Sequence, residues 1–367
     1  MIGERLRGRL EAWLQRVWFH QPEATAADRL LAALAAPLAL PLSGLVAATA
    51  RRRRRLIRRQ HPGDGAVPVV VVGNLVAGGA GKTPLSAAIA LGLQRAGLRP
   101  ALLCRGYRSA DGAPLLVTRD SDAASVGDEA IVLARDTGLP VASGRDRAAA
   151  LALLLRTHPD RDVVVSDDGL QHRGLPRRIE LVVVDDRGFG NRRCLPAGPL
   201  REPADRLASV DAIVATGGHA ADEAVREALA GTAAGEPVQR FRSVLEPRRW
   251  HRLDGGAEWD LETFARLVAG QRLAAVAGMA RPERFFETLH RLGLAADCHR
   301  LPDHGHIDPA WLAGLAADRI LMTGKDAARC RGFAPELLAR CAWLEVAAVP
   351  DPSLLEWLGA TLRPAAA

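Results

Sequence analysis

The residues with the clearest chemical meaning are Gly81, Lys82 and Thr83, which end a glycine-rich turn after the apolar run Val69–Val72. That run predicts a buried strand, and the residues from Thr83 onward predict a helix. The backbone N–H groups of such a turn and the N-terminus of its helix bind phosphate groups. A lysine in this place reaches the β- and γ-phosphates, and the hydroxyl after it holds Mg²⁺. The sequence therefore predicts a nucleotide-binding loop made of Val76, Ala77, Gly78, Gly79, Ala80, Gly81, Lys82 and Thr83.

Position 76 departs from the P-loop pattern, because it holds valine where glycine is expected, and Gly78 and Gly79 supply the flexibility instead. A glycine-rich turn that binds nothing is the alternative interpretation. The composition favours binding, since the chain has only two lysines, Lys82 and Lys325, against 47 arginines. A lysine kept among so many arginines indicates a need for a compact ammonium group rather than a planar guanidinium.

Two adjacent acids, Asp167 and Asp168, end a second apolar run that begins at Val163. P-loop enzymes place a metal-binding aspartate at the end of such a strand. We therefore expect Asp167 or Asp168 to coordinate Mg²⁺ together with Thr83, directly or through water. A simple Asp-Asp-Gly turn without a ligand is the alternative.

Three further side chains could contribute to catalysis or to substrate binding. Asp128 begins a predicted helix, where it could accept a proton from a hydroxyl or serve only as a helix cap, and the sequence leaves both open. His304 follows Asp303 in a polar loop, and an Asp–His pair suits acid–base chemistry, with a plain surface loop as the alternative. Arg201 lies in a proline-rich loop that either presents it to a phosphate or is a stiff connector.

The composition bounds the class of protein. A chain of 367 residues with 48% hydrophobic and 25% charged residues is typical of a globular protein of about two domains. Its net charge of +7 equals the seven arginines at positions 51–55, 58 and 59, so the rest of the chain is balanced. Aromatic residues make up only 4%, which argues further against nucleic-acid binding. The five cysteines form neither a C-x-x-C pair nor a zinc pattern, which indicates reduced thiols.

The amino-terminal segment has the composition of a membrane-associating segment. Residues 30–50 contain no charge and are long enough to span a bilayer, but Pro37 and Pro41 would break a regular helix. We expect a kinked hairpin or a monotopic insertion, with the arginines that follow resting on the anionic cytoplasmic leaflet. A buried helix pair followed by a solvated basic loop is the alternative.

Apolar runs and helical patterns alternate along the rest of the chain. This predicts an α/β protein with a mostly parallel sheet, helices on both faces, and a second, smaller α/β domain. Extended segments near residues 238–249 and 342–349 are expected to link the two domains. The predicted core strands cover residues 69–72, 100–103, 162–165, 181–184 and 212–214. The expected division is a membrane-associating segment at 1–60, a P-loop core at 61–236, a second domain with the linker strands at 237–350, and a closing helix and tail at 351–367.

Seven motifs follow one another along the chain: V-G-N-L-V-A-G-G-A-G-K-T-P at 72–84, R-G-Y at 105–107, V-G-D-E at 126–129, G-R-D-R at 144–147, D-D-G-L-Q-H at 167–172, L-P-A-G-P-L-R-E-P at 195–203 and P-D-H at 302–304. This series resembles the tetraacyldisaccharide 4'-kinase family of lipid A biosynthesis over nearly the whole chain. The resemblance implies transfer of the γ-phosphoryl group of ATP to the 4'-hydroxyl of a tetraacylated glucosamine disaccharide 1-phosphate. It also implies two α/β domains joined by a two-stranded linker, with the active site in the cleft.

The resemblance assigns roles to eight residues: phosphate and Mg²⁺ binding to Lys82 and Thr83, the metal site to Asp167 and Asp168, the catalytic base to Asp128, its support to His304, and contacts with the lipid to Asn74 and Arg201. The implied partners are ATP, the acylated disaccharide 1-phosphate and the anionic lipid surface of the inner membrane. Neither nucleic acid nor an obligate protein partner is implied. The expected location is the cytoplasmic face of the bacterial inner membrane, as a monotopic or peripheral protein.

Asp128 is expected in the first domain and His304 in the second, so that the two meet only when the cleft closes. The chain departs from the family's common pattern at Ala130, Gly305 and Gly324, none of which removes a proposed catalytic group. A membrane-associated switch ATPase is the competing interpretation, because that class shares the G-G-x-G-K-T turn. Such ATPases usually have a lysine directly before the paired glycines, where this chain has alanine.

Overall fold

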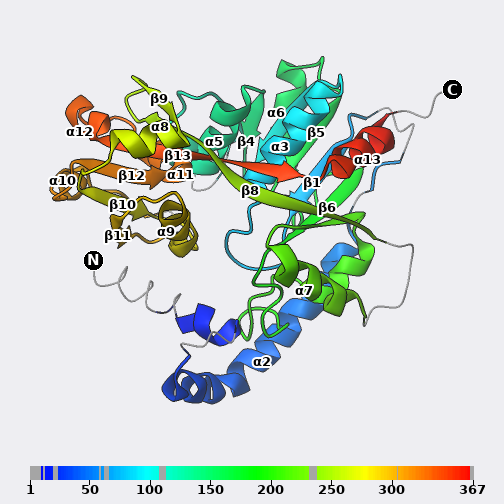
Figure 1. The fold of residues 1–367 in the computed structure, drawn as a ribbon. Helices are drawn as coiled ribbons and strands as arrows, with labels where there is room; N and C mark the ends of the chain where they lie inside the picture. The colour runs from blue at the N-terminus through cyan, green and yellow to red at the C-terminus, as the bar shows by residue number, and fades with distance from the viewer. Residues whose placement is uncertain are drawn as a thin grey trace. The chain divides into compact units, whose positions relative to one another are not determined.

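The chain forms two compact α/β units, each built of strands flanked by helices (Figure 1). The computed structural model describes residues 10, 13–19, 24–57, 59–61, 66–106, 113–230, 238–303 and 305–363. Unit 1 comprises Met1–Leu103, His158–Val244 and Pro350–Ala367, and unit 2 comprises Cys104–Thr157 and Leu245–Val349. Residues 104–157, which the sequence placed in the P-loop core, group with the second unit in this division, and the expected domain boundaries stay a prediction.

The centre of unit 1 is a parallel sheet with the strand order β8-β7-β6-β1-β5-β2. Its strands are β1 (Val69–Gly73), β2 (Pro100–Cys104), β5 (Val163–Asp167), β6 (Ile179–Val184), β7 (Ala212–Ala215) and the first part of β8 (Gln239–Arg252). The valine run of β1 is buried along its whole length, as expected for a strand in the middle of a parallel sheet. All five predicted core strands are present, with ends that differ by one or two residues.

Unit 1 also contains the helices α2 (Ala26–Arg54), α3 (Lys82–Arg95), α7 (Gly218–Ala230) and α13 (Pro352–Leu362), and the 3-10 helix η1 (Ala204–Ser209). Helix α3 follows β1 and buries Leu85, Ile89 and Leu93, which recur at a spacing of four residues. The closing helix α13 packs against α3 at Gly92, where an added Cβ would lie 2.6 Å from a methyl group of Leu355. This packing holds the C-terminal half of α3 against α13.

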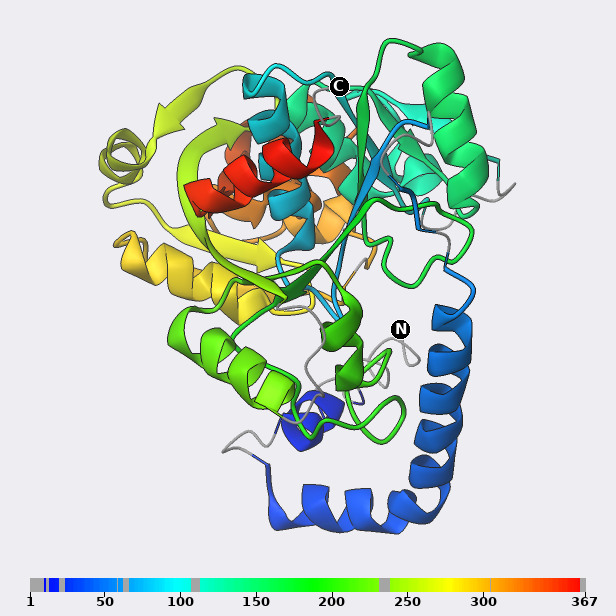
Figure 2. The ribbon, with the colours of Figure 1, turned by 90° about the vertical axis from the view of Figure 1, so that its right-hand side faces the viewer.

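Helix α2 is a continuous helix of 29 residues, so the two prolines do not interrupt it as the sequence suggested. Figure 2 shows it as two straight arms that meet at a bend. Pro37 and Pro41 account for such a bend, because each lacks the N–H that would bond the preceding turn. The helix begins at a capping box formed by Thr25 and Asp28.

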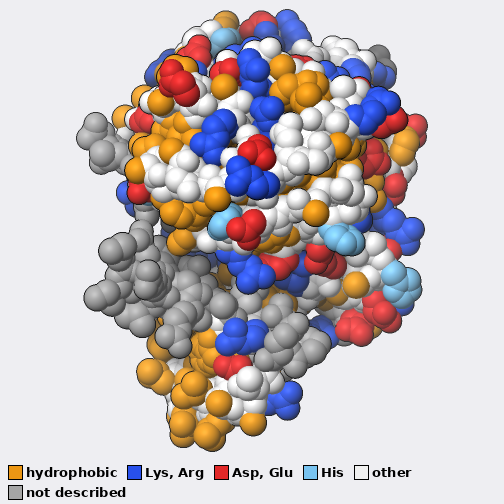
Figure 3. All heavy atoms as spheres, turned by 60° about the vertical axis from the view of Figure 1, so that its left-hand side comes forward, with side chains coloured by type: hydrophobic (Ala, Val, Ile, Leu, Met, Phe, Trp, Pro, Cys, Tyr) orange, Lys and Arg blue, Asp and Glu red, His pale blue; other side chains and the backbone are white. Residues whose placement is uncertain are grey.

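Most side chains of α2 are exposed, which contradicts the alternative of a buried helix pair. Leu34 and Leu38 are 70% and 73% exposed, and Figure 3 shows hydrophobic side chains gathered at the lower end of the view, where α2 lies. Among the described residues, α2 alone is long and apolar enough to cross a membrane, with a mean hydropathy of 2.1 in its most apolar window. This is a statement of length and composition.

Unit 2 contains a parallel sheet with the order β11-β10-β12-β13, to which the second part of β8 and the antiparallel β9 are added. Its strands are β3 (Leu115–Val117), β4 (Val141–Ser143), β9 (Glu258–Asp260), β10 (Leu273–Ala277), β11 (Ala296–Arg300), β12 (Arg319–Thr323) and β13 (Cys341–Pro350). Its helices are α4 (Ala123–Val126), α5 (Asp128–Thr137), α6 (Arg147–Thr157), α8 (Leu261–Leu267), α9 (Pro282–Arg291), α10 (Pro309–Ala313), α11 (Gly324–Arg329) and α12 (Pro335–Arg340). Stacked rings of Trp250 and Phe264, 4.4 Å apart, lie in its core.

The predicted fold class is confirmed, because both units are α/β structures with mostly parallel strands. Besides the crossings after Leu103 and Thr157, two strands carry the chain between the units: β8 leads into unit 2, and the end of β13 leads back to unit 1. These are the two linker strands that the sequence predicted. Residues 231–237, between α7 and β8, lie outside the described residues.

Candidate active site

The predicted nucleotide-binding loop lies between β1 and α3 in unit 1. Gly78 and Gly81 have φ angles of 98° and 79°, in the left-handed region that glycine adopts most readily. Lys82 and Thr83 are the first two residues of α3. A left-handed turn followed by a helix N-terminus directs backbone N–H groups toward one point, which is the arrangement that binds phosphate.

Side chains from three different strand ends hold the carbonyl groups of this loop. Asn74 donates hydrogen bonds to the carbonyls of Val76 and Gly78, at 2.8 and 3.4 Å. Arg187 donates to the carbonyl of Gly79 at 2.9 Å. Thr216 donates to the carbonyl of Ala80 at 3.3 Å. These bonds hold the carbonyls of the loop in place from three sides of the sheet end. No motif indicated Arg187 or Thr216, since they follow β6 and β7, whose ends meet the loop only in the folded sheet.

Asn74 was expected to face the lipid substrate, which stays a prediction, and in the structure it contacts the nucleotide loop. Its side chain is buried, and besides its two bonds to the loop it accepts a bond from Nζ of Lys82 at 3.2 Å. An amide can donate and accept at the same time, so one side chain shapes the loop and orients the lysine.

The valine at position 76 has a structural reason. Val76 forms a bridge to Leu200, and the neighbouring N–H of Ala77 bonds to the carbonyl of Pro199 at 2.8 Å. The N–H of Arg201 in turn bonds to the carbonyl of Leu75 at 2.7 Å. The first half of the nucleotide loop is thus an extended segment paired with the proline-rich loop, and a buried valine fits there as well as glycine.

The two adjacent acids have different partners. Asp167 is buried, and its two oxygens accept bonds from Thr83 at 2.7 Å and from Ser86 at 3.0 Å. Asp168 has a φ of 49°, so its carboxylate turns to another side and lies 3.4 Å from Nζ of Lys82 and 3.1 Å from Arg201. The turn after β5 therefore directs one acid to the start of α3 and the other to the cations.

The oxygen atoms of Thr83 and Asp167 suit Mg²⁺, which prefers hard oxygen ligands and keeps several waters or phosphate oxygens. Among the described residues, no group of three or more His, Cys, Asp or Glu side chains could hold a metal ion by itself. The donor set fits a Mg²⁺ shared between this protein and the phosphates of a nucleotide. It does not fit a metal held by the protein alone.

Arg201 also borders a hollow of about 300 Å³ in unit 1. One wall comes from the second half of α2 and the other from the loops after β5 and before η1. Its lining combines cations and apolar groups: Arg53, Arg54, Arg173 and Arg201, with Leu45, Val46, Ile57 and Leu170. Glu202 is also part of the lining, and burial raises the pKa of its carboxyl.

The predicted base Asp128 lies in unit 2, at the first position of α5. Its Oδ1 accepts the N–H of the next residue, Glu129, at 3.0 Å, while Gly127 holds the N-cap position of the helix. Its Oδ2 lies 3.9 Å from Nζ of Lys325 and 3.8 Å from Nε of Arg329. The carboxylate therefore bonds to the backbone of its own helix on one side and faces two cations on the other.

His304 lies outside the described residues, but its neighbour Asp303 is described and belongs to the same unit as Asp128. Nζ of Lys325 lies 3.4 Å from Asp303. Lys325 thus contacts both Asp128 and the residue before His304. Asp128 and Asp303 lie in the same unit in this grouping, and the expectation that Asp128 and His304 belong to different domains stays a prediction.

The fold and the nucleotide loop together define a P-loop phosphotransferase. Residues 35–363 match the family model of tetraacyldisaccharide-1-phosphate 4'-kinase. The chain therefore belongs to the tetraacyldisaccharide 4'-kinase family, as the sequence motifs indicated, and it is a kinase.

Similar proteins agree with this assignment. A tetraacyldisaccharide 4'-kinase of Bordetella petrii is 44% identical over 341 residues, which cover 90% of this chain and 93% of that protein. One of Dechloromonas aromatica is 41% identical and covers 96% of this chain and 98% of its own. Among solved structures, that of the apo form of LpxK from Aquifex aeolicus in complex with ATP has a TM-score of 0.69 at 23% identity, covering 91% of this chain and all of that one. At that identity the likeness supports the fold.

Proposed function

We propose that this kinase transfers the γ-phosphoryl group of ATP to the 4'-hydroxyl of tetraacyldisaccharide 1-phosphate. The observation that carries the proposal is the arrangement of Lys82, Thr83 and Asp167 where β1 and β5 meet the start of α3. P-loop kinases bind the phosphates with such a lysine and the metal with such a hydroxyl and acid. The acceptor is inferred from the names of the relatives.

Asp167, rather than Asp168, is the acid that we assign to the metal site. Its bond to the Thr83 hydroxyl places the two oxygen ligands together, whereas Asp168 already neutralises Lys82 and Arg201. Mg²⁺ would neutralise charge on the transferring phosphoryl group. Lys82 would bind the β- and γ-phosphates when nucleotide replaces Asp168 as its partner.

Asp128 is the proposed base, with His304 in support. Its carboxylate would take the proton of the 4'-hydroxyl while the new O–P bond forms and the bond between the γ-phosphorus and the leaving oxygen of ADP breaks. The reaction requires that Asp128 reach the acceptor hydroxyl while the loop of unit 1 holds the γ-phosphate.

The hollow beside α2 is the proposed site of the acceptor head group. Arginines such as Arg54 and Arg201 suit a phosphate, because the guanidinium forms paired hydrogen bonds with it. The apolar residues Leu45 and Ile57 on the same wall suit the first part of an acyl chain. The hollow therefore offers the two kinds of contact that a phosphorylated lipid needs.

An assay with γ-labelled ATP and the acylated disaccharide 1-phosphate tests the proposed function. We expect label in the lipid fraction, and only when both substrates are present. Label found solely in free phosphate would instead support the competing switch ATPase. A phosphorylated product whose new phosphate lies elsewhere than on the 4'-oxygen would refute the acceptor position.

We propose further that α2 inserts its exposed leucines into the lipid surface. Replacing Leu34 and Leu38 by glutamate should lower binding to anionic vesicles by at least about ten-fold for each residue, because burial of a leucine contributes about 1.5–3 kcal/mol. Vesicle co-sedimentation of the full-length protein measures this. Leu267→Glu is the control, since Leu267 is also exposed but lies on α8. Unchanged sedimentation of the double variant would contradict insertion through α2.

A further inference from the structure

Lys325 is the second of the two lysines in a chain with 47 arginines. It lies in the first turn of α11, after the capping residue Thr323. A cation in the first turn of a helix is unfavourable, because the helix dipole is positive there. Local structure therefore gives no reason for a lysine at this position, and the reason must lie in its contacts with other parts of unit 2.

Three carboxylates surround the ammonium group of Lys325. Nζ lies 3.4 Å from Asp303, 3.5 Å from Glu129 and 3.9 Å from Asp128, and the side chain is only 21% exposed. Burial alone would lower the pKa of Lys325, but the charges of Glu129, Asp128 and Asp303 outweigh it, so the pKa is raised above its ordinary value. The group is thus a partly buried, charged ammonium at the centre of an acidic cluster.

Arg329, one helical turn further on, fixes the direction of α11. It donates to the carbonyls of Gly305 (2.8 Å) and Gly278 (2.7 Å), and it pairs with the buried Asp326. Asp326 in turn accepts the N–H of Gly278 at 3.1 Å. Through these bonds α11 is anchored both to the end of β10 and to the loop that contains residue 304. Helix α11 therefore holds Lys325 in a fixed position beside Asp128.

We propose that Lys325 is a positioning residue for phosphoryl transfer, which holds the carboxylate of Asp128 and the Asp303 segment before His304 in one arrangement. The inference rests on the proposed role of Asp128 as the base. An ammonium group suits this task better than a guanidinium, because it is a compact charge with three donors that can face three carboxylates converging on one point. Arginine would present its donors in one plane.

A purely structural ion cluster would predict a different outcome. Removing the charge would then lower stability and leave turnover per folded molecule unchanged. A positioning role predicts lower turnover with ATP affinity preserved, because the phosphate-binding loop belongs to unit 1. It also predicts a changed pH profile, since a carboxylate that loses a neighbouring cation ionises less readily. The charged groups that remain around the site are Glu129, Asp303, Asp326 and Arg329.

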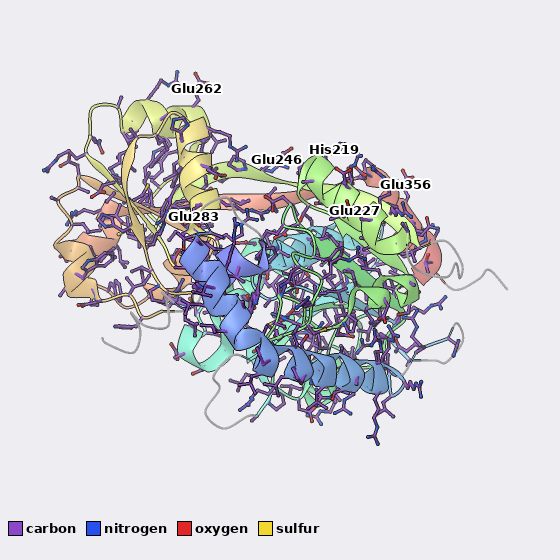
Figure 4. All side chains as sticks on the ribbon, turned by 90° about the horizontal axis from the view of Figure 1, so that it is seen from below. His219, Glu227, Glu246, Glu262, Glu283 and Glu356 are labelled. Carbon is purple, nitrogen blue, oxygen red and sulfur yellow. The ribbon has the colours of Figure 1, made fainter. Side chains whose placement is uncertain are left out.

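The test compares Lys325→Met and Lys325→Arg with wild type in the labelled-lipid assay, with kcat, the KM for ATP, Tm and the pH profile as readouts. For Lys325→Met we expect a loss in kcat of about 30- to 100-fold, a KM for ATP within about two-fold, and an acidic limb shifted to higher pH. Lys325→Arg should recover only part of the loss. The control is Arg266→Met, which removes an exposed charge paired with Glu262 on α8; Figure 4 shows Glu262 pointing away from the strands of unit 2.

The outcomes separate this inference from the function on which it rests. Wild-type protein that labels no lipid overturns the proposed function and the inference with it. Wild-type activity together with unchanged kcat and pH profile in Lys325→Met overturns the inference alone. If Lys325→Met does not fold, Lys325→Arg decides: wild-type kcat would show that any cation suffices and would refute the positioning role.

Discussion

Replacing Asp128 by asparagine is expected to lower kcat by about 100- to 10,000-fold, the usual contribution of a general base. Asparagine keeps the shape of the side chain, and its Oδ1 can still accept the N–H of Glu129. It cannot take the proton of the acceptor hydroxyl. ATP affinity should stay within about two-fold, because the nucleotide loop belongs to the other unit. Label transfer to lipid and binding of a fluorescent ATP analogue measure the two effects.

The control for this substitution is Asp297→Asn, which neutralises an acid of the same unit whose side chain is 80% exposed. It should leave both kcat and Tm unchanged. Asp128→Asn itself is expected to lower Tm, since Lys325 and Arg329 would lose one of their counter-charges. Near-normal turnover in Asp128→Asn would rule out the base assignment, and lost ATP binding would show that the substitution disturbs more than the base.

Much of unit 1 could be predicted because its signals are local in the sequence. A run of valines that is buried on both faces identifies β1 without any knowledge of its neighbours. The phosphate-binding function of the loop that follows can be predicted from the loop's own residues. The metal-binding role of Asp167 can be predicted from its place at the end of another buried run. Parallel strands bring these carboxyl ends together, so the contact between Thr83 and Asp167 was also within reach.

The other contacts depend on pairings between distant strands and loops, which cannot be recognised in a single sequence. The bond from Arg187 to Gly79 requires β6 to lie beside β1, and the role of Val76 requires the proline-rich loop to pair with it. The grouping of Asp128 with Lys325 in one unit has the same origin. Residues 104–157 continue the strand and helix alternation of the core, and only their long-range packing shows that they belong with unit 2.

The two lysines, seen together, occupy similar places. Lys82 is the first residue of α3 and lies 3.4 Å from Asp168, while Lys325 is the second residue of α11 and lies 3.9 Å from Asp128. In each case an ammonium group in the first turn of a helix faces an acid that the reaction is proposed to use or displace. This supports the view that the chain keeps lysine where a compact charge is required and uses arginine elsewhere.

Replacing Lys82 by methionine is accordingly expected to lower kcat by about 100- to 1,000-fold, because the transition state would lose a charged donor at the transferring phosphate. The fold should remain intact, since Asp168 keeps Arg201 as a partner at 3.1 Å. The matched control is Arg95→Met, at the other end of α3, where the side chain bonds only to the carbonyl of Leu91 among the hydrogen bonds recorded for it. Label transfer to lipid gives kcat, and thermal unfolding checks the fold.

Lys82→Arg is the more discriminating variant. The lysine side chain is only 10% exposed and ends between Asn74 and Asp168. A guanidinium is larger and planar, so it cannot occupy the same place without moving the amide that holds the carbonyls of the loop. We therefore expect Lys82→Arg to be nearly as inactive as Lys82→Met, although its charge is preserved. Substantial activity in Lys82→Arg would mean that charge alone suffices at the phosphates, and it would remove the argument drawn from the scarcity of lysine for both sites.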